Sequence, residues 1–264
     1  MYGSQLTYLA SDIRQLIASF RIGLINTLGR NLIAIYPLGS IAFPRFEPRS
    51  GDIDFYVLLR RSLTSTERKR LDIMHRTLSS RFRFGKALDG FYIPLKKARR
   101  KPMPSHLLFA ANGRLHGRGR DDAWALHRQH LLRGACLILY GPKPKAIVPS
   151  ASWHEIRRAL NMEISFAEKI MPKYPSWAVL NLCRLIYSYE KRQVVISKIQ
   201  AAEWALGNLP SQWRALIRSA LGVYLMKRKK DQRMLRKNSN AFFKFASSRI
   251  TKAKRMARNK SLVH

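Results

Sequence analysis

Ser50-Gly51-Asp52-Ile53-Asp54-Phe55-Tyr56-Val57-Leu58-Leu59 is a segment in which two acids precede an uninterrupted apolar run. A strand places residues i and i+2 on the same face, so Asp52 and Asp54 project together while Ile53 points into the core. Carboxylates are hard oxygen ligands, and Mg²⁺ prefers one or two of them together with nucleotide phosphate oxygens. The segment therefore predicts a strand that carries a magnesium site open to a nucleotide.

A Gly-Ser pair closes the apolar segment before this one. Residues 32–38 read as a strand, and Gly39 and Ser40 follow where the chain must turn. Glycine lets a phosphate approach the free backbone N–H groups of such a turn, and Ser40 adds a hydroxyl donor. The pattern favours a triphosphate contact, and an ordinary turn is the alternative.

The next strand-like run, residues 86–95, carries a third acid, Asp89. An unpartnered charge is costly to bury, so an acid within an apolar strand suggests a metal centre as its partner. The alternative is an acid at a strand-end turn beside Gly90.

The order of these motifs along the chain resembles that of the nucleotidyltransferase (polymerase beta-like) superfamily. More narrowly, the chain is similar to the aminoglycoside adenylyltransferases that act on streptomycin and spectinomycin. The narrower resemblance depends on residues 179–188, residues 197–205, Leu209-Pro210 and the earlier Leu139-Tyr140-Gly141-Pro142. It covers about residues 30 to 225.

The resemblance implies an α+β protein with an N-terminal nucleotidyltransferase-fold mixed sheet, followed by an all-α helical bundle. It implies Mg²⁺-dependent transfer of AMP from ATP to a hydroxyl of an aminoglycoside or aminocyclitol antibiotic, with release of pyrophosphate. The implied roles are metal ligands (Asp52, Asp54, Asp89), a catalytic base (Asp89) and ATP contacts (Gly39, Ser40, Arg184, Lys198).

The chain also departs from the family pattern. The position of Asp89 is commonly Glu in the family. The streptomycin-modifying members resemble one another in having acids just before the arginine-bearing helix, where this chain has Lys173-Tyr174-Pro175-Ser176-Trp177. For Arg184 itself, a helix-surface arginine is the alternative interpretation.

The chain has 264 residues and a formal net charge of +35. A field of this sign attracts polyanions, so non-specific nucleic-acid association is expected. The charge also keeps two other functions open: nucleotidyl transfer to RNA or protein, and a non-catalytic nucleic-acid-binding module. A cationic antibiotic would need local acids, and the candidates are Asp121, Asp122, Glu163 and Glu203.

The cysteines and the hydropathy of the sequence indicate in which cellular compartment the protein works. Cys136 and Cys183 lie in apolar segments without CxxC spacing, so both are expected to be reduced core residues. The sequence contains neither a signal-like start nor an apolar run long enough for a membrane span. We therefore expect a cytoplasmic protein without a membrane partner.

We expect a catalytic domain over residues 1–145. Apolar periodicity and turn residues indicate its helices and loops. The pattern predicts a helix at 11–22, a helix begun by a Thr64–Glu67 capping box and running to about 82, a loop at 96–120 and a helix at 121–132. Trp124 is expected in the core. His127 and His130 share the last of these helices without a third ligand, which argues against zinc.

A Pro-rich segment at 141–150 separates this part from an expected all-α domain over residues 146–264. Ser152 and Glu155 predict a helix cap, and helices are expected at 155–170, 176–191, 198–207 and 210–225. A basic tail begins at about residue 227. It is either a helix packed by Phe242, Phe243 and Phe245 or an RNA-binding arm whose aromatics stack on bases.

Overall fold

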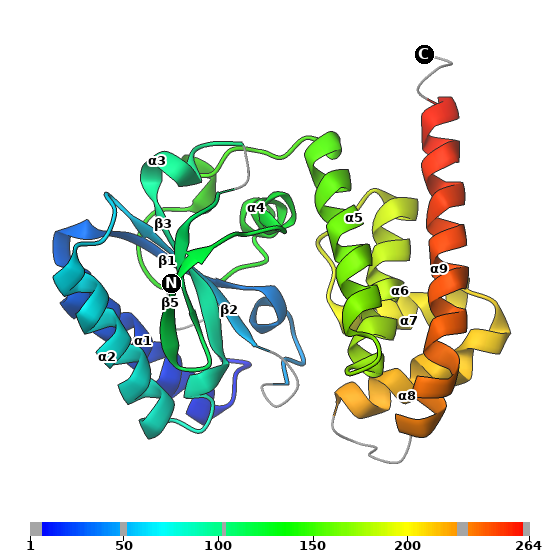
Figure 1. Cartoon of the computed structure of the whole chain (residues 1–264), viewed down its shortest axis with the longest axis horizontal. Helices are drawn as coiled ribbons and strands as arrows, with labels where there is room; N and C mark the ends of the chain where they lie inside the picture. Colours follow the sequence, from blue (N-terminus) through cyan, green and yellow to red (C-terminus); the bar gives the residue numbers. More distant parts are fainter. Residues whose placement is uncertain (1–6, 48–51, 102–103, 226–231, 261–264) are drawn as a thin grey trace. The chain divides into compact units, whose positions relative to one another are not determined.

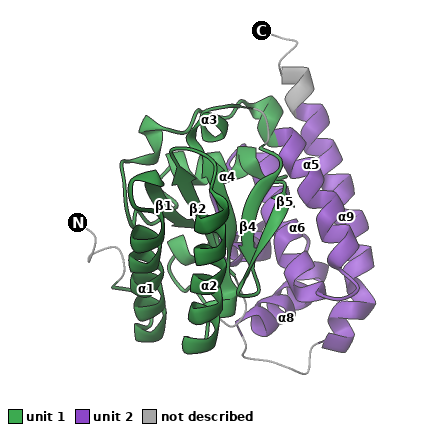
Figure 2. Ribbon diagram, turned by 60° about the vertical axis from the view of Figure 1, so that its left-hand side comes forward, with its two compact units in different colours: residues 1–156 green, residues 157–264 purple. Residues whose placement is uncertain are grey.

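The structure is a computed structural model that describes residues 7–47, 52–101, 104–225 and 232–260. The chain divides into two compact units, residues 1–156 and residues 157–264, and each is described by itself (Figures 1 and 2). The division falls in the first turn of α5 (Trp153–Ile170), a short distance after the predicted boundary at residue 145.

Unit 1 is built on a five-stranded mixed sheet in the order β1-β2-β3-β4-β5. The strands are β1 (Leu32–Leu38), β2 (Ile53–Leu59), β3 (Leu88–Pro94), β4 (Leu107–Ala111) and β5 (Arg114–Gly119). β2 and β3 run parallel, and the other neighbouring pairs are antiparallel. A mixed sheet followed by helices confirms the predicted fold class.

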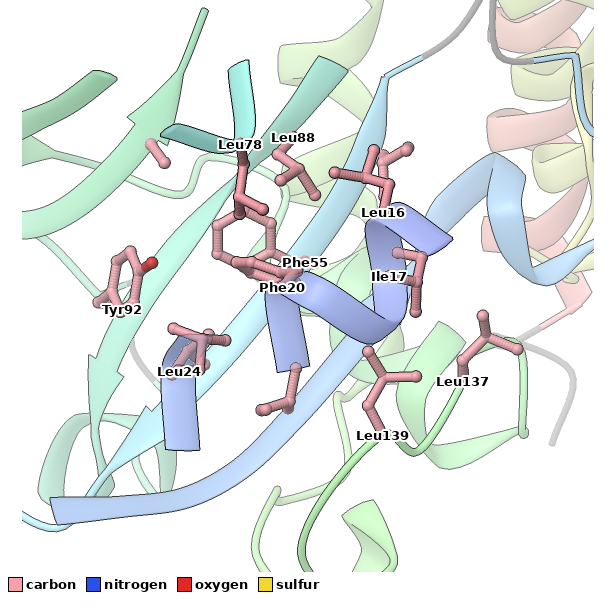
Figure 3. Packing of buried hydrophobic residues seen from close by; sticks show 14 of the residues in the cluster. Leu16, Ile17, Phe20, Leu24, Phe55, Leu78, Leu88, Tyr92, Leu137 and Leu139 are labelled. Atoms are coloured by element: carbon pink, nitrogen blue, oxygen red, sulfur yellow. The ribbon is translucent and has the colours of Figure 1, made fainter. Parts of the chain in front are cut away.

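Two helices cover one face of this sheet. They are α1 (Ser11–Leu28) and α2 (Ser65–Arg81), and the predicted capping box between Thr64 and Glu67 begins α2. Figure 3 shows Phe20 of α1 packed against Phe55 of β2 within this core. Because side chains alternate along β2, residues 53, 55, 57 and 59 face these helices and the even-numbered residues face the other side.

The opposite face of the sheet packs against α3 (Leu95–Ala98) and α4 (Trp124–Leu132). Trp124 is almost completely buried there, which confirms its predicted place in the core. Cys136 is buried in the same cluster, in a segment that makes isolated bridges to β1. This is the face toward which Asp54 and Tyr56 of β2 project.

The sequence predicts a loop over residues 96–120, and this prediction is wrong. These residues include α3 and the β4–β5 hairpin, whose turn is formed by Asn112 and Gly113, both with positive φ (52° and 73°). Asn-Gly between two extended segments is a strong hairpin signal, which the glycines and basic residues of β5 obscure. β5 is mostly exposed, so it lacks the apolar alternation of a half-buried strand.

Unit 2 is helical, with α6 (Pro175–Lys191), α7 (Lys198–Asn208), α8 (Arg214–Tyr224) and α9 (Gln232–Lys260) following α5. Glu155 accepts from the backbone N–H and the hydroxyl of Ser152, and the Ser152 Oγ accepts from the Glu155 N–H, which confirms the predicted cap. Cys183 is fully buried on α6. No helix among the described residues is both long and apolar enough to cross a membrane.

A buried histidine in unit 1 should make the stability of the fold depend on pH. His75 of α2 lies against the ring of Phe55, and its Nε2 is 2.6 Å from the Tyr92 hydroxyl. Burial lowers the pKa of His75 from 6.5 to about 4. Between these values the unfolded chain binds a proton that the folded chain does not, so stability falls as the pH decreases from 6.5 to 4.

We expect His75 to contribute a loss of about 2–3 kcal/mol across this range, at 1.36 kcal/mol per pKa unit. The His75→Gln variant should lack this pH dependence, whatever its stability at pH 7. Urea unfolding of both proteins from pH 7 to pH 4.5 measures the difference, and the exposed His154→Gln serves as the control. Equal slopes for wild type and His75→Gln would contradict the expectation.

Candidate active site

Two of the predicted acids stand side by side on neighbouring strands. Asp54 of β2 pairs in register with Asp89 of β3, and both side chains are half-buried. Asp52 directly precedes β2 and is exposed. The strand register therefore gathers carboxylates from two separate segments of the chain at one end of the central strand pair.

The pKa of Asp89 indicates that these carboxylates interact. Burial, and next the negative charge of Asp52, raise the pKa of Asp89 to about 6, while His116 of β5 has a smaller opposing effect. Burial disfavours the ionised carboxylate most, and like charges disfavour one another's ionised forms, so part of the rise in the pKa of Asp89 reflects repulsion by Asp52. A bound cation would relieve this repulsion.

The Gly-Ser pair forms a short 3-10 turn, Gly39–Ala42, at the end of β1 and beside the acids. Gly39 has a φ of 71°, and a Cβ at this position would overlap Oδ2 of Asp54. The Ser40 hydroxyl donates a 3.3 Å hydrogen bond to the Asp52 carbonyl. The turn is thus fastened to the acidic strand, and only glycine leaves room for the Asp54 carboxylate.

The Gly39→Ala variant is expected to lose the adenylyl transfer that the resemblance implies while remaining folded, because its Cβ would displace the Asp54 carboxylate. Gly134→Ala is a matched control, since Gly134 also has a positive φ (78°) but a Cβ on it would meet no atom within 4 Å. Both variants incur a backbone cost of roughly 1–2 kcal/mol. Label transfer from [α-³²P]ATP measures activity, and equal activity in the two variants would contradict the expectation.

The chemistry of the donor set fits Mg²⁺ as a shared ion. Within the described ranges, no group of three or more His, Cys, Asp or Glu side chains is placed so that it could hold a metal ion. Mg²⁺ seldom uses such cages and completes its coordination with water and substrate phosphates. Asp52, Asp54 and Asp89 would therefore supply part of the coordination, and nucleotide oxygens the rest.

A buried polar network that the sequence reasoning missed supports β2 from the α4 side. Tyr56 lies two residues after Asp54 on the same strand face, and its hydroxyl donates to the Asp121 carboxylate. His127 Nδ1 lies 3.1 Å from Asp121 Oδ1 and also contacts the Tyr56 hydroxyl. Burial, and next the charge of Asp121, raise the pKa of Tyr56 well above 10, with a further contribution from Asp54.

In unit 2, Arg184 is half-buried on α6, so it is not a fully exposed surface arginine. Its Nη2 lies 3.1 Å from Oε2 of Glu163 on α5, and Asn181 Nδ2 donates to the same oxygen at 3.2 Å. The carboxylate therefore fixes the guanidinium on one side. Positioned arginines are suited to phosphate oxygens because their donors form a rigid fork.

Lys198 is the first residue of α7 and follows the capping box formed by Ser197 and Gln200. Its Nζ lies 4.4 Å from the ring centroid of Trp177 and 5.8 Å from that of Tyr224. Trp177 precedes Arg184 by seven residues on α6, a spacing that puts both on one helix face. The contact of Lys198 with Trp177 joins two different helices, so no spacing in the sequence indicates it.

The acids proposed to attract a cationic antibiotic have partners within the chain. Asp121 is buried in the Tyr56 network, so its expected role as an accessible acid is wrong. Asp122 pairs with Arg120, and Glu163 pairs with Arg184. Glu203 is exposed on α7 and also interacts within the chain.

Comparison with known proteins adds two findings. Residues 146–249 match the family model for the aminoglycoside adenylyltransferase C-terminal domain. The chain has the fold of spectinomycin adenyltransferase AAD(9) from Enterococcus faecialis, solved with ATP and spectinomycin. That comparison has a TM-score of 0.72 at 19% identity and covers 90% of this chain and 99% of the other. No curated protein sequence matches this chain.

The mixed sheet followed by a helical unit gives the chain the fold of a solved adenyltransferase. The match over residues 146–249 makes this part of the chain similar to the C-terminal domain of aminoglycoside adenylyltransferases. The roles of the individual site residues stay predictions.

Proposed function

We propose that this protein transfers AMP from ATP to a hydroxyl group of an aminoglycoside or aminocyclitol antibiotic, depends on Mg²⁺ and releases pyrophosphate. The observation that carries the proposal is the register of Asp54 with Asp89 beside Gly39, with Asp52 close enough to affect the pKa of Asp89. The family of the C-terminal domain supports the reaction class.

In this proposal the acceptor oxygen forms a bond to the α-phosphorus of ATP, and the bond from that phosphorus to the leaving pyrophosphate oxygen breaks. Asp89 accepts the proton of the acceptor hydroxyl at its carboxylate. Asp52, Asp54 and Asp89 would hold Mg²⁺, which offsets charge on the entering and leaving oxygens when it is bound.

The remaining side chains orient the triphosphate. The turn at Gly39 and Ser40 offers backbone N–H groups and a hydroxyl to phosphate oxygens. Arg184 and Lys198 supply fixed positive donors, one oriented by Glu163 and the other by Trp177. Tyr56 acts through packing: its bond to Asp121 fixes the strand segment that carries Asp54.

Incubation with [α-³²P]ATP, Mg²⁺ and a panel that includes spectinomycin and streptomycin tests the proposal. We expect label on at least one drug and, with [γ-³²P]ATP, an equal amount of labelled pyrophosphate. Omission of Mg²⁺ should abolish both products. Transfer to no member of the panel by a protein that binds ATP would contradict the antibiotic as acceptor.

Nucleotidyl transfer to RNA or protein is the second candidate. It is favoured by the internal partners of Asp121, Asp122 and Glu163, which leave a cationic drug fewer accessible carboxylates. Label from [α-³²P]ATP on added RNA or on a protein band, rather than on a drug, would identify this activity.

A further inference from the structure

The last helix of unit 2 presents a long face that consists only of hydrogen-bond donors and hydroxyl or amide groups. Its exposed residues recur at spacings of three, four and seven, which align on one side of an α-helix. They are Arg233, Lys237, Asn240, Lys244, Ser248, Thr251 and Arg255, and we call them the α9 stripe. At 1.5 Å per residue the stripe is roughly 33 Å long.

The stripe carries charge of one sign. Residues 232–260 contain no Asp or Glu, and the exposed Arg236 and Lys252 flank the stripe. Two basic residues on the sides of α9 do have partners: Arg249 pairs with Glu190 at 2.6 Å, and Lys254 donates to Asn161. Among the described residues, the cations of the stripe form no such ion pairs, so their field is directed to the solvent.

The opposite side of α9 holds the helix in place. Leu235, Phe242, Ala246 and Ile250 are buried, and α9 packs against α6 and α8. Phe242 and Phe245 both pack on Trp213. This confirms a final helix packed by its phenylalanines. Stacking on bases is excluded for Phe242, which is buried, while Phe243 and Phe245 are partly exposed.

We propose that the α9 stripe binds the phosphate backbone of double-stranded nucleic acid, independently of base sequence and of the adenylyl-transfer reaction. A rigid row of Lys, Arg, Asn, Ser and Thr side chains supplies the donors that contact phosphate and sugar oxygens. The stripe has no aromatic ring for base stacking, so it has no means to select single strands.

The packing of α9 argues against a membrane surface as the partner. An amphipathic helix binds a bilayer by inserting its apolar face into the headgroup region. The apolar face of α9 is already buried within unit 2. Apart from Met256, the large side chains that α9 exposes over residues 232–256 are charged or polar, and their positive charge complements a regular array of phosphates.

Fluorescence polarisation tests the proposal with the full chain and labelled 20-base-pair RNA and DNA duplexes of two unrelated sequences, at 50–300 mM NaCl. The test variant is Lys237→Gln, Lys244→Gln, Arg255→Gln. The matched control is Arg68→Gln, Lys69→Gln, Arg70→Gln, which removes the same charge from the surface of α2. Both variants are surface changes, and circular dichroism verifies their folding.

We expect the stripe variant to bind at least tenfold more weakly at 100 mM NaCl. The slope of its log affinity against log salt should become less negative by about 3, because each lost phosphate contact removes about 0.9 from the magnitude of the slope. The control variant should keep the wild-type slope, and both duplex sequences should bind alike. Equal weakening in the two variants would assign binding to net charge and overturn the proposal. Absence of wild-type binding at 50 mM NaCl, or binding to phosphatidylserine vesicles but not to duplexes, would also overturn it.

Discussion

The Asp54→Asn variant is expected to remain folded and to transfer adenylate about 10²–10³-fold more slowly than the wild type, the range found when one group that stabilises transition-state charge is removed. Asparagine keeps the shape of the side chain but not its charge. Asp54 lies opposite Asp89 and against Gly39, so the substitution changes the charge at the centre of the acidic group. Initial rates of pyrophosphate release at saturating ATP measure the effect.

Asp122→Asn is the matched control for this substitution. Asp122 is an exposed acid of unit 1 whose partner is Arg120, so its amide variant loses the same charge outside the site. We expect it to keep the wild-type rate. An Asp54→Asn protein as fast as Asp122→Asn would remove Asp54 from the catalytic centre.

The Glu155→Ala variant is expected to lose about 3–5 kcal/mol of stability, because it leaves a buried arginine without its carboxylate. Arg128 of α4 has a fully buried side chain, pairs with Glu155 and lies 5.8 Å from the Trp124 ring. Arg128 Nη1 also donates a 3.3 Å hydrogen bond to the Ser150 carbonyl. Urea unfolding followed by tryptophan fluorescence measures the loss.

Two further variants separate the buried charge from other effects of this substitution. Glu168→Ala removes an exposed glutamate from the same helix and should change stability by less than about 0.5 kcal/mol. Arg128→Met combined with Glu155→Ala should recover much of the loss, because an apolar side chain needs no counter-ion. A double variant less stable than Glu155→Ala would show that the arginine is not the source of the cost.

The parts of the fold that the sequence predicts are those that depend on local pattern. The alternation around Asp52 and Asp54 predicts the strand, and the caps at Thr64 and Ser152 mark where helices begin. The β4–β5 hairpin was missed because β5 is an exposed edge strand without apolar alternation. Its Asn112-Gly113 turn was the one local sign of it.

The candidate site likewise has features that the sequence predicts and features that depend on tertiary packing. The proximity of Asp54 and Asp89 follows from two strands with acids near the same end, once those strands pair in parallel. The contacts of Tyr56 with Asp121 and His127 depend on how α4 packs on the sheet, and no spacing in the sequence specifies that packing. Likewise, the bond from Arg184 to Glu163 joins residues on different helices.

Binding of Mn²⁺, a spectroscopic substitute for Mg²⁺, tests the central claim most directly. Electron paramagnetic resonance would follow Mn²⁺ titrated into the protein with a non-hydrolysable ATP analogue. The account predicts binding by the wild type and Asp122→Asn and a loss of at least tenfold in affinity in the double variant Asp52→Asn, Asp54→Asn. Unchanged Mn²⁺ affinity in the double variant would contradict it.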